Sequence, residues 1–84
     1  MNKAEIEKII FYSLKQIAPE TEPIKLLPND NIRETLGIDS FDFLQFIVML
    51  DDKLNINIPE KDYGKIKSID TLLNYLLIKT EKLS

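Results

Sequence analysis

Ser40 is the residue whose type and position best suit it for chemistry. It lies where a loop is expected to give way to a helix, so its hydroxyl would face solvent. A nucleophilic serine needs a base beside it, usually a histidine. The 84 residues contain no His and no Cys, which excludes Ser–His and Cys–His dyads, thiolate metal sites and disulfides. Ser40 is therefore better interpreted as a modification site than as a catalytic serine, and any thiol chemistry must come from a cofactor or a partner.

The helix that positions Ser40 is predicted to start at Asp39 or Ser40 and to end near Leu54. Asp39 is a good N-cap, and Gly37 permits the turn before it. At 100° per residue, one apolar stripe forms the expected core face: Phe43, Phe46, Ile47, Leu50 and Leu54. A second apolar patch falls on another side of the same helix: Phe41, Leu44 and Val48, edged by Gln45, Asp51 and Asp52.

Acidic residues are concentrated around this helix. Residues 30–62 contain three bases and eight acids, in a chain of net charge −3. Charges on a helix usually mark only a solvated face. Here they surround an apolar patch, and exposed apolar surface with a charged rim marks interaction sites. The helix is therefore predicted to be a docking surface.

Three other helices complete the predicted fold. The first runs from about Lys3 to Ile17, begins with a capping box and ends before Pro19. A short helix is expected at about 60–66, and a final amphipathic helix follows a cap at Ser68. The prediction is an all-α antiparallel bundle of three longer helices and one short helix, in a single domain of residues 1–84.

A long connection, residues 18–38, joins the first two longer helices. A helical turn is expected within residues 31–36, and long loops in small domains tend to pack down through their own side chains. The apolar side chains expected to pack this loop onto the core are Ile24, Leu26, Leu27, Ile32 and Leu36.

Composition and charge exclude several classes of function. A sequence pI of about 4.8 argues against a nucleic-acid partner. No apolar run approaches the roughly 18 residues of a membrane span, and the N-terminus lacks the apolar core of a signal peptide. We therefore expect a cytoplasmic protein without a membrane span, and a monomer.

The residues around Ser40 resemble the attachment motif of acyl carrier proteins. Residues 37–42 read Gly-Ile-Asp-Ser-Phe-Asp, where that family normally has Asp-Ser-Leu after a Gly and an apolar residue. Residues 56–60 match the family's apolar-x-Ile-Pro step into a short helix, and residues 68–72 match the opening of its last helix. Tyr75 stands where the family often has Tyr. The resemblance runs without an evident gap over residues 38–77.

This resemblance implies a carrier that does no catalysis itself. A phosphopantetheinyl transferase would attach 4′-phosphopantetheine to Ser40, where the helix N-terminus favours a phosphodiester. The thiol of that arm would carry an acyl group as a thioester, in fatty-acid or related acyl-chain biosynthesis. No metal is implied.

The resemblance also implies two further sets of residues. Acyl-transferring, condensing or ligase enzymes would dock on Asp39, Phe41, Asp42, Leu44, Gln45, Val48, Asp51 and Asp52. We expect charge reversal at Asp51 and Asp52 to leave stability almost unchanged. The acyl chain would lie among Phe43, Phe46, Leu50, Ile58, Tyr63 and Ile66.

Several departures from the family pattern leave the cargo open. Phe41 replaces the usual Leu, as it does in D-alanyl carrier proteins. Gln45 and Lys61 stand where acids are common. The bulky Phe43 is either an ordinary core aromatic, which is the more common case, or a residue that narrows the mouth of the pocket and favours short or medium chains. One alternative is a specialised aminoacyl, D-alanyl or secondary-metabolite carrier. The other is a helical interaction module of the same fold that is never modified.

Overall fold

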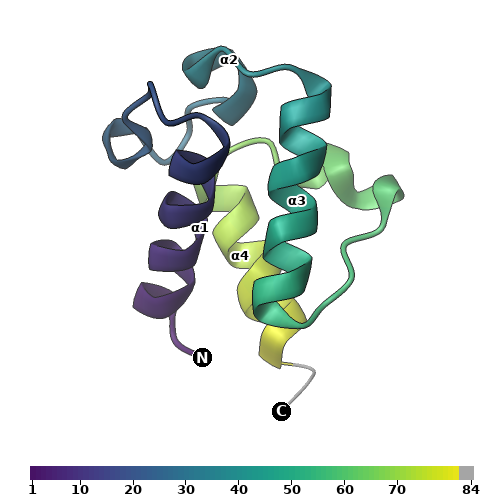
Figure 1. The fold of residues 1–84 in the computed structure, drawn as a ribbon. Coiled ribbons are helices and arrows are strands. Elements are labelled where there is room, and N and C mark those ends of the chain that lie inside the picture. The colour runs from purple at the N-terminus through teal and green to yellow at the C-terminus, as the bar shows by residue number, and fades with distance from the viewer. Residues whose placement is uncertain (82–84) are drawn as a thin grey trace.

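Three long helices pack around one core in the computed structural model, which describes residues 1–81 (Figure 1). The last three residues of the predicted domain lie outside the described residues. The elements, in chain order, are α1 Lys3–Ile17, η1 Pro23–Lys25, α2 Ile32–Leu36, α3 Ser40–Leu54, η2 Glu60–Lys65 and α4 Ile69–Glu81, where η marks a 3₁₀-helix. α1 contacts both α3 and α4, and both run antiparallel to it (Figure 1). Residues 1–81 form no strand, apart from an isolated bridge between Asn31 and Ser68, which confirms the predicted all-α fold.

The helix boundaries follow the capping signals in the sequence. At the start of α1, the Glu5 amide donates to Asn2 Oδ1 at 2.9 Å, and the Asn2 amide donates to Glu5 Oε1 at 3.2 Å. At the start of α4, the Thr71 amide donates to Ser68 Oγ at 3.2 Å. These bonds satisfy amides that have no partner within the helix. The predicted bounds of α1 and α3 are confirmed.

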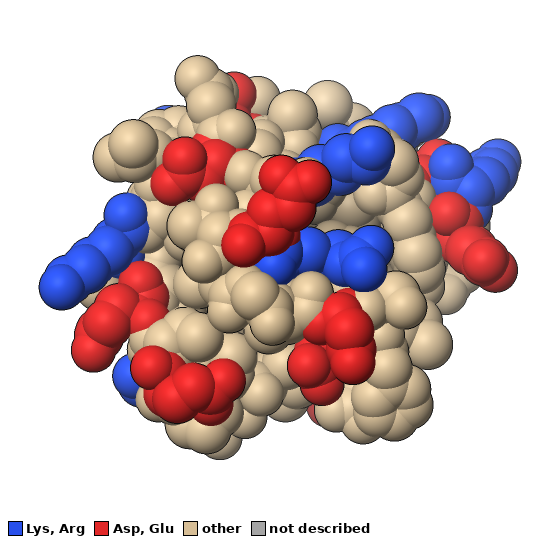
Figure 2. Space-filling view, turned by 90° about the horizontal axis from the view of Figure 1, so that it is seen from above, with Lys and Arg blue, Asp and Glu red and all other residues tan. Residues whose placement is uncertain are grey.

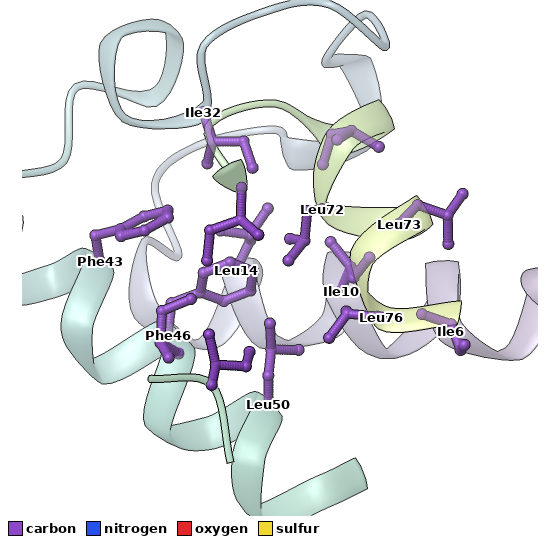
Figure 3. Packing of buried hydrophobic residues seen from close by; sticks show 14 of the residues in the cluster. Ile6, Ile10, Leu14, Ile32, Phe43, Phe46, Leu50, Leu72, Leu73 and Leu76 are labelled. Carbon is purple, nitrogen blue, oxygen red and sulfur yellow. The ribbon is translucent and has the colours of Figure 1, made fainter. Parts of the chain in front are cut away.

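The core is formed by facing stripes of the three long helices (Figure 3). Every residue predicted for the core face of α3 is buried. The fully buried apolar side chains from the long helices are Ile6, Ile10, Leu14, Phe46, Ile47, Leu50, Leu72 and Leu76. Burial of such a stripe fixes the rotation of a helix about its axis, so the packing determines which residues of α3 remain on the surface.

The connection between α1 and α3 packs onto the core with only part of the predicted set. Leu26 and Ile32 are buried, and Leu36 packs against the core. The prediction was wrong for Ile24 and Leu27, which are 68% and 65% exposed. η1 turns the chain tightly here, so successive side chains point in different directions, and the buried residues are Pro23 and Leu26.

Ser13 is a polar residue on the buried face of α1. Its side chain is fully buried, and no hydrogen-bond partner for its hydroxyl is found among residues 1–81. A buried, unsatisfied hydroxyl costs free energy because it has lost its contacts with water. We therefore expect Ser13→Ala to raise the free energy of unfolding by about 1 kcal/mol, measured by urea denaturation. Gln16→Ala, at an exposed position of the same helix, controls for helix propensity. Its free energy of unfolding should rise by only about 0.3 kcal/mol. A Ser13→Ala protein no more stable than the control would contradict this reasoning.

Candidate functional site

Ser40 is presented by a turn that joins α2 to α3. Gly37 ends α2 in the left-handed region, with φ of 70°, which a residue with a side chain rarely adopts. Ile38 then anchors the turn in the core. Asp39 caps α3, because its Oδ1 accepts a hydrogen bond from the Asp42 amide at 2.8 Å. Ser40 is consequently the first helical residue, and it is exposed.

Ser40 lies on the rim of a surface cleft of about 530 Å³. α2 supplies Arg33 and Glu34, α3 supplies Phe43 and Leu44, and the segment around η2 supplies the remaining wall: Tyr63, Gly64 and Lys67. Figure 2 views the end of the molecule where α2 and the start of α3 lie, and it shows basic side chains between acidic ones. The Ser40 hydroxyl thus borders both open solvent and a hollow large enough to hold a small organic group.

The outer side of α3 combines apolar and acidic residues, as predicted. Phe41, Leu44 and Val48 are 63%, 44% and 57% exposed. Asp39, Gln45 and Asp52 are also exposed, and Asp42 is half-buried. Asp39 directly precedes Ser40 and the other residues follow it along α3, so a protein that binds them would be placed next to the Ser40 hydroxyl.

Asp51 has a structural contact that sets it apart from the other acids of α3. Its Oδ1 accepts a hydrogen bond from the Ile58 amide at 3.0 Å, which ties the end of α3 to the segment before η2. Burial raises the pKa of the Asp51 carboxyl, although the Ile58 amide and the charge of Lys79 act in the opposite direction. The sequence-based expectation for charge reversal at Asp51 did not include this bond. Because a lysine cannot accept it, we expect Asp51→Lys to lower the free energy of unfolding.

Comparison with known proteins identifies the family. A family model described as a phosphopantetheine attachment site matches residues 13–76. The acyl carrier protein of Thermosynechococcus vestitus is 29% identical over 77 residues, which cover 90% of this chain and 93% of that protein. The acyl carrier protein of Campylobacter jejuni is 32% identical over 63 residues, which cover 75% of this chain and 79% of that protein. Acyl carrier protein 2, mitochondrial, of Arabidopsis thaliana is 26% identical over 76 residues, and this chain spans 60% of its length.

The chain belongs to the acyl carrier protein family. The family membership predicted from residues 37–42 is thereby confirmed, and phosphopantetheine is the cofactor for which the matched family provides the attachment site. The start of α3 fits such a group. Ser40 is exposed beside an open cleft, and no hydrogen bond within residues 1–81 engages its hydroxyl.

None of the helices described is both long and apolar enough to cross a membrane.

The residues predicted to form an acyl pocket in this carrier occupy two different environments. Phe43 and Tyr63 line the cleft beside Ser40. Phe46, Leu50, Ile58 and Ile66 lie behind them in the closed core and are essentially inaccessible to solvent. The Phe43 and Phe46 rings pack at 5.8 Å between centroids, with a tilt of 55°. An acyl chain could reach the four inner residues only if this packing opened.

The carrier holds η2 against α4 through a contact that sequence reasoning missed. The Tyr75 hydroxyl donates a hydrogen bond of 2.6 Å to Asp62 Oδ2, and Lys65 Nζ lies 3.4 Å from Asp62 Oδ1. The hydrogen bond from Tyr75 lowers the pKa of Asp62. Burial, followed by the bond to Asp62, raises the pKa of Tyr75 to about 12. Asp62 follows Glu60 and Lys61 in a short, mostly polar segment, so the local sequence gives no signal that this acid is buried.

This contact predicts a stability that depends on pH at both extremes. Because the folded pKa of Asp62 lies below its ordinary 3.8, its contribution is complete above that value and is lost as the pH falls through the folded pKa. Because the folded pKa of Tyr75 lies above its ordinary 10.0, its contribution is complete below 10.0 and is lost as the pH rises towards 12. Tyr75→Phe should lower the urea midpoint at neutral pH. Between neutral pH and either acidic or alkaline pH, the variant should then lose less stability than wild type loses. Parallel pH profiles for the two proteins would show that the bond contributes nothing.

Proposed function

We propose that this chain carries acyl intermediates as thioesters on a phosphopantetheine arm attached to Ser40. The observation that carries the proposal is the position of Ser40, exposed at the first turn of α3, on the rim of a cleft and beside the apolar and acidic outer side of the helix. Once attached, the arm supplies a terminal thiol to which acyl groups are bonded. The chain itself presents the acyl group and does no catalysis, which agrees with the carrier names of its relatives.

Attachment requires a separate enzyme, because Ser40 has no histidine in the chain to act as its base. In the proposed transfer, Ser40 Oγ forms a bond to the phosphorus that bears the arm. The bond from that phosphorus to the nucleotide part of the donor, coenzyme A, breaks, and the Ser40 proton leaves to a base of the transferase. The N-terminus of α3 would stabilise the charge of such a phosphodiester through the helix dipole and the amides of the first turn.

The proposal is tested by incubating the wild-type chain with a broad-specificity phosphopantetheinyl transferase and coenzyme A. Intact mass should increase by one arm, and an acyl-coenzyme A donor should add the arm with its acyl group. Treatment with hydroxylamine should release the acyl group and leave the arm, because thioesters react with hydroxylamine and phosphodiesters do not. A chain that gains no mass would instead support an unmodified interaction module.

We further propose that partner enzymes dock on the outer side of α3. Exposed acids steer a basic partner towards its site and raise the association rate, while Phe41, Leu44 and Val48 provide apolar contact. The partners proposed are the transferase and acyl-transferring, condensing or ligase enzymes. We also propose a role in the fatty-acid pathway and a cytoplasmic location, although two relatives carry the word mitochondrial in their names.

Asp52→Lys is the variant that tests this surface, because Asp52 is exposed and its side chain makes no hydrogen bond or ion pair within residues 1–81. We expect affinity for the transferase to fall about two- to fivefold at low salt, which is the size of one exposed charge pair. The loss should shrink at high salt. Glu20→Lys makes the same charge change in the connection after α1 and should leave affinity unchanged. Equal effects of the two variants, measured by calorimetry, would argue against docking on α3.

A further inference from the structure

The cleft beside Ser40 has a charge opposite to that of the chain. Arg33 and Lys67 line it together with one acid, Glu34, whereas the chain as a whole has a net charge of −3. The ion pair found within residues 1–81 is that of Lys65 with Asp62, so neither Arg33 nor Lys67 has a carboxylate partner there. Both side chains are exposed, and the basic groups at this end of the molecule are visible in Figure 2. Two cations without partners on one cleft favour an anionic occupant.

The floor of the same cleft limits how deeply an occupant can enter. Phe43 is only 7% exposed and packs on the fully buried Phe46. Tyr63 closes the neighbouring wall, with the fully buried Ile66 three residues further along the chain. Well-packed cores resist insertion of even a few methylene groups. The cleft is therefore suited to a short group with a charged end, and less suited to a long alkyl chain.

We propose that Arg33 and Lys67 form an anion site for the group carried on Ser40. The proposal rests on the proposed function, because it requires an arm at Ser40. Two anions fit this chemistry: the phosphodiester that joins the arm to Ser40, and a carboxylate at the end of a short acyl cargo. Both would meet the same pair of cations. A cationic aminoacyl cargo would be repelled by them, so the site disfavours the D-alanyl alternative.

The experiment compares cargoes of similar size and different charge on the intact chain. The transferase loads Ser40 with arms that bear a succinyl, a succinamoyl or a β-alanyl group, each through a stable amide in place of the thioester. These groups end in a carboxylate, a neutral amide and an ammonium. The melting temperatures of these forms, and of the apo and unacylated holo forms, are measured at low and high salt.

Four proteins are compared: wild type, the cleft variant Arg33→Gln/Lys67→Gln, and two controls. The first control, Lys8→Gln/Lys25→Gln, removes two exposed lysines outside the cleft. The second, Glu34→Gln, removes the acid of the cleft and should strengthen binding of an anion. Intact mass establishes for each protein that one arm is attached. Absence of the arm would defeat the proposed function, whereas an attached arm without the shifts below would defeat only this inference.

If the cargo carboxylate is the anion, wild type bearing succinyl should melt about 2–4 °C above the succinamoyl form, and the β-alanyl form should melt lowest. If the phosphodiester is the anion, the three acylated forms should have the same melting temperature. The increase in melting temperature from the apo to the holo form should then be smaller in the cleft variant than in wild type. In either case the lysine control should behave as wild type, and high salt should weaken the effect. Shifts that are equal in the cleft variant and in wild type would overturn the proposal.

Discussion

Ser40→Ala is expected to abolish attachment of the phosphopantetheine arm while leaving the helical fold intact. The methyl group has no oxygen to bond to the phosphorus, so the effect should be complete rather than partial. Co-expression with the transferase, followed by intact mass spectrometry, measures the outcome. The variant should retain the unmodified mass under conditions in which wild type is fully modified.

The fold should survive this substitution because no hydrogen bond within residues 1–81 engages the Ser40 hydroxyl. Asp39 supplies the cap of α3, through the Asp42 amide, and its side chain is unchanged. We expect the free energy of unfolding to stay within about 0.5 kcal/mol of wild type. Helical circular dichroism should also be unchanged, so that loss of modification cannot be attributed to unfolding.

Ser68→Ala provides the control, since Ser68 is a serine immediately before another long helix, α4. It caps α4 through the Thr71 amide, so the variant should lose about 1 kcal/mol of stability and should still accept one arm. A Ser40→Ala protein that gains the mass of the arm would show that another residue carries it.

The elements that were predicted correctly are those that strong local signals specify. Asn2 with Glu5 and Asp39 are capping residues that act on amides three positions away, so their effect can be read within a few residues. The apolar stripe of α3 has a helical period throughout its length, and each of its members is buried. Ser40 could therefore be placed at a helix start, and next to an apolar and acidic surface, before any tertiary contact was known.

The features that were missed depend on contacts between distant segments. Ile24 lies in the single turn of η1 and Leu27 in the loop after it, and segments this short have no sustained period to indicate which side chain faces the core. Asp62 is buried because Tyr75, thirteen residues away, donates to it. The cleft lies between α2, which supplies Arg33, and the segment around η2, which supplies Lys67. Its two basic residues are therefore far apart in a sequence that is acidic overall, and no local stretch shows them together.

Phe43 connects the stability of this carrier to the size of its cargo. Its ring is almost wholly buried, yet one side of it lines the cleft beside Ser40. It packs on Phe46, which is fully buried. Phe43 therefore forms part of the barrier between the cleft and the core residues that the sequence predicted for the acyl pocket.

Phe43→Ala is expected to lower the free energy of unfolding by about 3 kcal/mol, because it leaves a cavity in a small core. Phe41→Ala removes the same ring from an exposed position two residues earlier, and it should cost no more than about 0.5 kcal/mol. The cavity should also admit a longer acyl chain, with a gain of up to about 0.8 kcal/mol for each methylene buried. Urea denaturation of the apo proteins measures the loss of stability, and melting temperatures of holo proteins that bear short and long acyl chains measure the gain from the cargo.

In wild type the stabilisation by the acyl chain should level off at short chains, because the Phe43 ring blocks the core, whereas in Phe43→Ala it should continue to rise with chain length. If wild type gains stability steadily through long chains and Phe43→Ala gains no more, then Phe43 is an ordinary core residue and does not limit the cargo.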